Sequence, residues 1–113
     1  IATPEYNYSI PGILKNAIDY ATRPSGDNSF AKKPVALMGA STGMFGTARA
    51  QYHLRQVLVS LDMYPLNRPE VMVTLAESKI DPNGVLTDPK TRDMIGRLLV
   101  NLVAWTRKLQ EKL

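Results

Sequence analysis

Residues 2–12 read Ala-Thr-Pro-Glu-Tyr-Asn-Tyr-Ser-Ile-Pro-Gly, a stretch typical of a strand end followed at once by a helix start. Thr3 precedes a proline, which biases its backbone toward the β region, and Pro4 ends any helix or central strand there. Ser9 is a candidate N-cap, and Pro11 falls in the first helical turn, where its missing N–H costs little. The stretch therefore predicts a strand-to-helix turn that carries two tyrosines.

After this turn, the apolar residues follow helical and strand patterns in alternation. Residues 34–40 form an apolar run without alternation, which suits a strand buried on both faces of a parallel sheet. Asp88 is a candidate N-cap with Pro89 at the first helical position. The expected elements are a helix over residues 10–22, a strand over 34–40, a helix that ends near Asp62, a strand over 70–75, and a helix from 88 or 89 to the end.

This β-α-β-α-β-α pattern, which begins in mid-strand, predicts an α/β fold with a parallel sheet and right-handed crossovers. In such folds, ligands bind at the carboxyl ends of the strands. Three strands alone would leave the opening strand as a long exposed edge. We therefore expect a further βαβ unit upstream, and residues 1–113 to be the C-terminal portion of a single domain.

The composition excludes several classes of protein. The 113 residues contain no cysteine, which rules out a disulfide framework, a thiolate metal site and a cysteine nucleophile. The net charge of +4 comes from dispersed basic residues. They do not favour a nucleic-acid partner. The lack of cysteine fits a cytoplasmic location, which we expect. No apolar run is long enough to cross a bilayer, so we expect no membrane partner.

Residues 3–9 and 41–47 are the two stretches with a composition suited to a ligand. A planar amphipathic ring needs aromatic surface and a few placed N–H and C=O groups, which a Tyr-Asn-Tyr turn supplies. The second stretch is another strand-to-helix turn. Its glycines match neither a dinucleotide fingerprint nor a P-loop, so their spacing alone leaves open a tight turn or a close approach to a flat ligand.

Two other chemistries are set aside. Ser41 has no histidine base nearby in the sequence and no G-x-S-x-G elbow around it, so a hydrolase triad is rejected. His53 is the sole histidine and has no metal-ligand neighbours at suitable spacing, so we expect no metal. Basic residues on the last helix are spread around it, which favours solvation over a phosphate-tracking surface.

The two stretches carry a family resemblance. Residues 3–12, continued by Leu-Lys-Asn-Ala-Ile-Asp at 14–19, and residues 39–49, continued to Gln56, resemble the NADPH-dependent FMN reductases, particularly their bacterial quinone and chromate reductase branch. The resemblance runs from end to end. It implies a flavodoxin-like, three-layer α/β/α fold with strand order 2-1-3-4-5, FMN at the carboxyl edge of the sheet, and NADPH as electron donor.

The resemblance also implies roles for individual residues. The isoalloxazine ring of FMN would lie between two loops, and we expect the first loop to act largely through its backbone. The residues implied for FMN are Pro4, Glu5, Tyr6 and Asn7 in the first loop and Ser41, Thr42, Gly43 and Gly46 in the second. The residues expected at the acceptor pocket are Tyr8, Ile10 and Met44. The family usually has Gly-Gly where this chain has Gly46-Thr47, and its phosphate-binding turn is not present in these 113 residues.

One helix face is expected to mediate assembly. Family members commonly form dimers or tetramers, and we expect the interface at Arg49, Tyr52, His53 and Glu70, with Glu70 paired to Arg49 across it. A solvated face is the alternative. The implied activity is hydride transfer from NADPH to FMN and then electron delivery to quinones or other small oxidised acceptors. The rivals are an FMN-binding electron carrier without NADPH turnover and a truncated, flavin-free assembly subunit.

Overall fold

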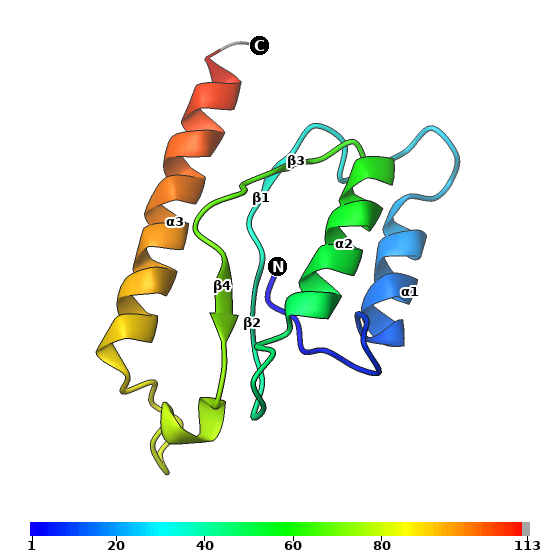
Figure 1. Ribbon diagram of the computed structural model, residues 1–113. Helices are drawn as coiled ribbons and strands as arrows, with labels where there is room; N and C mark the ends of the chain where they lie inside the picture. Colours follow the sequence, from blue (N-terminus) through cyan, green and yellow to red (C-terminus); the bar gives the residue numbers. More distant parts are fainter. Residues whose placement is uncertain (112–113) are drawn as a thin grey trace.

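The structure is a computed structural model in which residues 1–111 are described. It consists of short parallel strands between helices (Figure 1). In chain order the elements are α1 (Gly12–Ala21), β1 (Pro34–Val35), β2 (Met38–Ala40), α2 (Ala48–Ser60), β3 (Tyr64–Pro65), β4 (Val71–Val73), the 3-10 helix η1 (Ala76–Ser78) and α3 (Pro89–Gln110). The last two residues of the expected final helix, 112 and 113, lie outside the described part.

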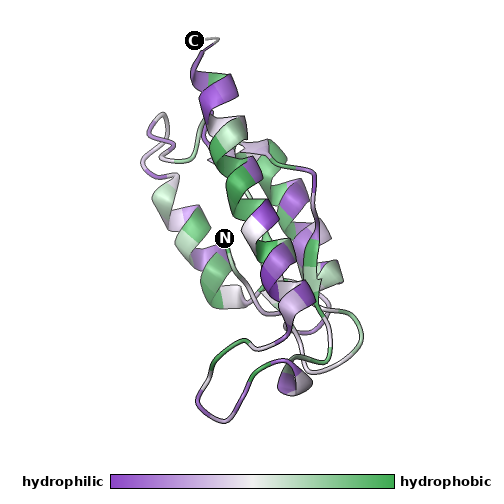
Figure 2. Cartoon of the chain, turned by 90° about the vertical axis from the view of Figure 1, so that its left-hand side faces the viewer, coloured by the Kyte–Doolittle hydropathy of each residue, from purple (hydrophilic) through white to green (hydrophobic). Residues whose placement is uncertain are grey.

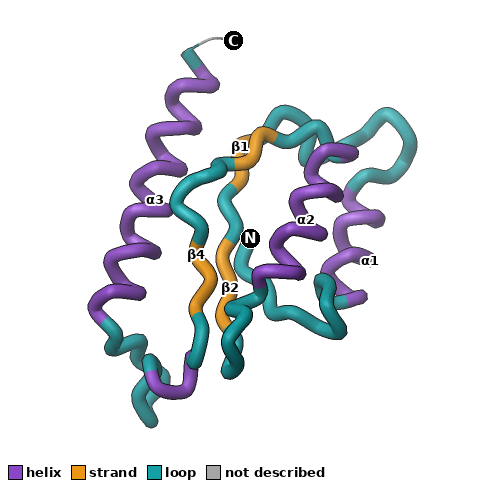
Figure 3. The backbone as a smooth tube through the Cα atoms, viewed as in Figure 1, coloured by secondary structure: helices purple, strands orange, loops and turns teal. Residues whose placement is uncertain are grey.

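The elements form three layers, as the sequence predicts. In Figures 1 and 3 the strands lie between α3 on one side and α1 with α2 on the other. β2 pairs in parallel with β4, and β1 pairs in parallel with β3. The opening residues also run parallel to β2, because Ala2 forms a bridge with Met38 and the Thr3 N–H donates to the Met38 carbonyl at 3.1 Å. The spatial order is therefore opening segment, β2, β4.

The expected single strand over residues 34–40 is wrong in detail, because it is split into β1 and β2. Pro34 pairs with Tyr64, an offset of 30 residues, whereas Met38 pairs with Val71, an offset of 33. The segment between β3 and β4 is therefore three residues longer than the segment between β1 and β2, and the extra residues interrupt the pairing. The same feature makes β3 a separate strand, in a segment between Asp62 and residue 70 where the sequence analysis expects no strand.

The starts of two helices were expected from capping residues, with opposite outcomes. At α3 the expectation is confirmed: the Thr91 N–H donates to Asp88 Oδ2 at 2.9 Å, with Pro89 at the first helical position. At α1 it is wrong. The N-cap residue is Pro11, with no side-chain cap, and Ser9 lies two residues earlier in a turn.

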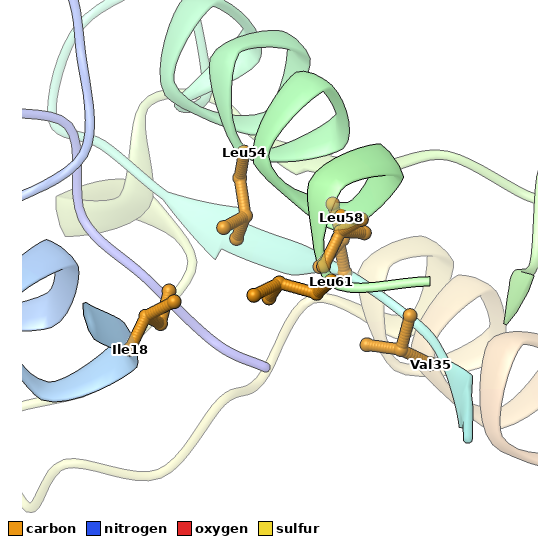
Figure 4. Close-up of a cluster of buried hydrophobic side chains, with 6 residues drawn as sticks. Ile18, Val35, Leu54, Leu58 and Leu61 are labelled. Carbon is orange, nitrogen blue, oxygen red and sulfur yellow. The ribbon is translucent and has the colours of Figure 1, made fainter. Parts of the chain in front are cut away.

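Two apolar clusters cover the two faces of the strands. Figure 4 shows the first, between α1, α2 and the strands, where Ile18, Val35, Leu54, Leu58 and Leu61 converge. The second lies under α3 and is built around Val71, Val73 and Leu98. Leu54 and Leu58 are fully buried and Leu98 is 2% exposed. The clusters fix α2, and hence the loop that precedes it, against the sheet.

Helix α3 also has an exposed apolar side. In Figure 2, helix α3 faces the viewer, and hydrophobic and hydrophilic residues alternate along it. Its exposed apolar residues are Leu99, Val100 and Val103. Within residues 1–111, no helix is long and apolar enough to cross a membrane.

Candidate functional site

The first loop is a tight turn at the carboxyl end of the opening segment. The Tyr6 N–H donates to the Ser9 carbonyl at 2.9 Å, and the Ser9 N–H donates back to the Tyr6 carbonyl at 3.0 Å. Asn7 and Tyr8 between them have φ angles of +48° and +71°. This is a type I′ turn, for which asparagine is well suited and a tyrosine is unusual. A bulky side chain in the left-handed region marks a position whose conformation is imposed by its surroundings, as often occurs at functional sites.

The second loop is closed by the hydroxyl of Ser41. The Gly46 N–H donates to Ser41 Oγ at 2.9 Å, which joins the two ends of the loop. The loop is also attached to the segment after β4, because the Leu75 N–H donates to the Gly43 carbonyl and the Ala76 N–H to the Ser41 carbonyl, both at 2.9 Å. Ser41 therefore shapes the loop, which leaves Thr42, Gly43 and Met44 exposed at its tip.

Both loops lie at the same edge of the sheet, since they follow neighbouring parallel strands at their carboxyl ends. This edge is at the bottom of Figure 1. The side chain of Glu5 connects the first loop to the start of α2. Glu5 Oε2 accepts from Arg49 Nε at 2.6 Å, and Glu5 Oε1 accepts from the Ala50 N–H at 2.9 Å. Glu5 thus acts through hydrogen bonds, and its side chain is only 8% exposed.

The charge state of Glu5 follows from these contacts. Burial alone would raise the pKa of the Glu5 carboxyl. The hydrogen bonds from the Arg49 side chain and the Ala50 amide, together with the charge of Arg49, outweigh burial and hold that pKa below its ordinary value. Glu5 therefore remains ionised at neutral pH, and it is unsuited to act as a general acid.

Aromatic rings from both loops approach the same cation. The guanidinium carbon of Arg49 lies 3.7 Å from the ring centroid of Tyr8 and 4.1 Å from that of Phe45. These distances are within the range of favourable cation–π contacts. The rings nevertheless remain 66% and 58% exposed. Arg49 therefore touches both loops at once.

The glycines of the second loop, and Gly39 in the strand before it, serve different purposes. A Cβ on Gly46 would lie 2.6 Å from the Met72 carbonyl carbon, and one on Gly39 would lie 1.9 Å from Thr47 Oγ1. These two glycines are required by the packing of the protein itself. A Cβ on Gly43 would meet nothing within 4 Å. Gly43 is therefore the glycine of this loop whose surroundings leave room for a ligand.

Thr47 departs from the Gly-Gly pattern and occupies a conformation that suits glycine, with φ of +69°. It is fully buried, and its Oγ1 accepts from Gln51 Nε2 at 3.0 Å. Gln51 Nε2 also donates to the Val71 carbonyl at 2.9 Å. This buried network ties the end of the second loop to β4 and compensates for the strained backbone of Thr47.

The remaining residues expected at the ring or the acceptor pocket divide into exposed and partly buried ones. Tyr6 and Met44 are 59% and 69% exposed, so their side chains are available at the open edge. Ile10 instead packs against the apolar cluster of Figure 4. Its position in the acceptor pocket stays a prediction, and its observed contacts are with the core.

The four residues expected at an interface lie on or near the outer side of α2. Tyr52 Oη donates to Glu70 Oε2 at 2.7 Å, which raises the pKa of Tyr52, and Arg68 pairs with Glu70 Oε1 at 3.2 Å. His53 Nδ1 is 3.0 Å from the hydroxyl of Ser9. Arg49 pairs with Glu5 of the same chain, so its pairing with Glu70 is not seen within the chain.

Sequence reasoning missed Phe45 and the part that Arg49 plays between the loops. No local pattern indicates that an arginine on a helix will reach two aromatic rings 37 residues apart. In residues 1–111, no group of three or more histidine, cysteine, aspartate or glutamate side chains could hold a metal ion.

Comparisons with known proteins identify the family of the chain. The family model for NADPH-dependent FMN reductase matches residues 1–78. The chain is 57% identical over 109 residues to an NAD(P)H-dependent FMN reductase of Pseudomonas aeruginosa, covering 96% of this chain and 58% of the relative. It is 46% identical over 107 residues to a 2-hydroxy-1,4-benzoquinone reductase of a Burkholderia species, covering 95% and 58% respectively.

A solved structure gives the same result. The flavoenzyme NAD(P)H:(acceptor) oxidoreductase FerB of Paracoccus denitrificans superimposes with a TM-score of 0.85 at 39% identity, covering 95% of this chain and 59% of that one. The fold is therefore flavodoxin-like, as expected, and the order of opening segment, β2 and β4 agrees with the last three strands of the order 2-1-3-4-5. The chain belongs to the NADPH-dependent FMN reductase family. It spans about 58% of the length of these curated relatives.

Proposed function

We propose that this protein is an FMN-dependent NAD(P)H oxidoreductase that delivers electrons to quinones and other small oxidised acceptors, chromate among them. The observation that carries the proposal is the pair of linked loops at one sheet edge, with an open glycine and exposed aromatic rings, in a chain of this family. The names of the Burkholderia relative and of a quinone reductase of Escherichia coli, 51% identical over 94 residues, support a quinone-like acceptor.

The residues present fit the ring of FMN. Gly43 and its exposed neighbour Thr42, with the exposed Asn7, allow close approach of a flat group, and Tyr6 and Tyr8 offer aromatic surface. Glu5 ties the first loop to the start of α2, and Ser41 and Gly46 close the second loop. We assign the exposed Pro4 to the backbone surface beside the ring. Neither loop contains a phosphate-binding turn, so we assign these residues to the ring of the cofactor and not to its phosphate.

These contacts give the protein a positioning role and leave the electron-transfer chemistry to FMN. FMN, when bound, supplies the hydride and electron transfer between NADPH and the acceptor. The protein orients the ring through the two loops, and Tyr8 and Met44 border the space where the acceptor would lie. Glu5 is already paired with Arg49 and Ala50, so no proton transfer is assigned to it.

The test is flavin binding and turnover by the purified protein. We expect a flavin absorption band on addition of FMN, and NADPH oxidation when a quinone is added. Gly43→Val should weaken FMN binding without loss of stability, because its side chain would enter the open space beside the loop. Gly96→Val, at an exposed glycine of α3 with equally open surroundings, is the matched control.

Tyr8→Ala should likewise weaken FMN binding or turnover, with Tyr20→Ala, an 83% exposed tyrosine of α1, as its control. Flavin binding without NADPH oxidation would identify an electron carrier instead. Unchanged FMN affinity and turnover in both loop variants would refute the two-loop site.

We further propose that the protein is a cytoplasmic homodimer or homotetramer that uses the surface of Arg49, Tyr52, His53 and Glu70. Support comes from Tyr52, which is 52% exposed and held in place by Glu70, as an ordered aromatic at an interface would be. Sedimentation of Tyr52→Ala should show a smaller species than the parent protein, whereas Tyr20→Ala should not.

A further inference from the structure

The contacts of Arg49 link two loops that are otherwise far apart in the sequence. Tyr8 belongs to the first loop and Phe45 to the second, and both rings lie within 4.1 Å of its guanidinium carbon. The rings belong to different strand ends, so a shared cation couples their positions. No other ion pair or cation–π contact within residues 1–111 joins the two loops.

The guanidinium is itself held in a fixed orientation. Its Nε and Nη2 both donate to Glu5 Oε2, at 2.6 and 2.5 Å, and the other oxygen of Glu5 accepts from the Ala50 N–H at the start of α2. Two donors on one carboxylate restrict the plane of the guanidinium. Glu5 also neutralises its charge, so Arg49 is poorly suited to attract an anionic ligand by itself.

We propose that Arg49 is a positioning residue that sets the separation of the two loops and so preorganises the ring site of FMN. The proposal rests on the proposed function, which assigns both loops to the flavin ring. Holding the loops in their binding arrangement before the cofactor arrives removes part of the ordering cost of binding.

The chemistry requires arginine and not merely a positive charge. The guanidinium is planar and weakly hydrated, so it can lie over aromatic faces while it forms two hydrogen bonds to Glu5, whereas the ammonium of lysine is a compact, strongly hydrated charge. Arg49→Lys should therefore keep the ion pair and lose much of the link between the rings.

Hydrogen exchange of the two loops tests the link without relying on flavin. The amides of Tyr6 and Ser9 in the first loop and of Gly46 in the second are hydrogen-bonded and report on loop opening. In the purified protein without FMN, we expect Arg49→Ala to speed exchange about tenfold in both loops. Arg55→Ala, on the same helix but bonded to Asn67 and the Leu66 carbonyl, should leave both loops unchanged.

A second variant keeps the test decisive if Arg49→Ala does not fold. Phe45→Leu retains an apolar side chain and removes the aromatic face, and we expect it to speed exchange at Tyr6 and Ser9, in the loop to which Phe45 does not belong. Faster exchange confined to the second loop, or none in either, would overturn the coupling.

Flavin titration then tests the consequence for the site. We expect the dissociation constant of FMN to rise about tenfold in Arg49→Ala and severalfold in Arg49→Lys, with the KM for NADPH of the flavin-saturated enzyme within twofold of the parent. A large rise in that KM with unchanged FMN affinity would show that Arg49 contacts NADPH and would refute the positioning role. If the parent protein binds no FMN, the proposed function fails, while the exchange experiment still decides whether Arg49 links the loops.

Discussion

Replacing Gly46 with alanine should destabilise the second loop, because Gly46 has a φ of +55° and lies directly against β4. A Cβ there would lie 2.6 Å from the Met72 carbonyl carbon and 2.8 Å from its oxygen. The left-handed backbone costs an L-residue about 1–2 kcal/mol. Forcing a methyl group against backbone atoms that cannot rotate away costs about 1–3 kcal/mol more. We therefore expect Gly46→Ala to lower the free energy of unfolding by about 2–5 kcal/mol.

Urea denaturation of Gly46→Ala beside Gly43→Ala measures this effect. Gly43 is three residues earlier in the same loop, and a Cβ there would meet nothing within 4 Å. Its replacement should be neutral or stabilising by up to about 1 kcal/mol, since alanine reduces the entropy of the unfolded chain. If the two variants unfold at the same urea concentration, neither the left-handed backbone at position 46 nor its contact with β4 requires glycine there.

Three further substitutions test the core, a helix cap and a buried carboxylate. Leu54→Ala, at a fully buried position of the cluster in Figure 4, should cost about 3–5 kcal/mol of unfolding free energy in urea, and Val59→Ala, 80% exposed on the same helix, should cost little. Asp88→Ala should lower the melting temperature by removing the cap of α3, whereas Asp93→Ala, farther along that helix, should change it much less. Because folding lowers the pKa of the Glu5 carboxyl below its ordinary value of 4.5, the ionised carboxylate stabilises the fold above pH 4.5. The difference in unfolding free energy between the parent protein and Glu5→Gln should therefore shrink as the pH falls below 4.5.

The order and type of the main elements were predictable from local patterns. The apolar run at 34–40 and the helical stripes on either side indicated an α/β fold, and Asp88 with Pro89 marked the start of α3 correctly. These signals are local, since helix periodicity and capping depend on residues within a few positions of one another. Ser9 failed as a cap because its segment closes a turn with Tyr6 before the helix begins.

The division of the expected strand over residues 34–40 into β1 and β2, and the separate strand β3, were not predictable. It depends on the register between residues 34–40 and 64–73, where three extra residues on one side interrupt the ladder. Register is set by pairing between distant segments, and a single sequence without its partner alignment does not reveal it.

Local sequence alone was enough to locate the two loops of the candidate site, because each loop is a contiguous stretch with its own turn residues. The contacts of individual residues in these loops required the three-dimensional fold: Gly46 packs against β4 and Gly43 faces open space, while Glu5 pairs with Arg49, which touches Tyr8 and Phe45. The physical reason is distance along the chain. Glu5 and Arg49 are 44 residues apart, and they meet because parallel strands bring successive carboxyl ends to one edge of the sheet.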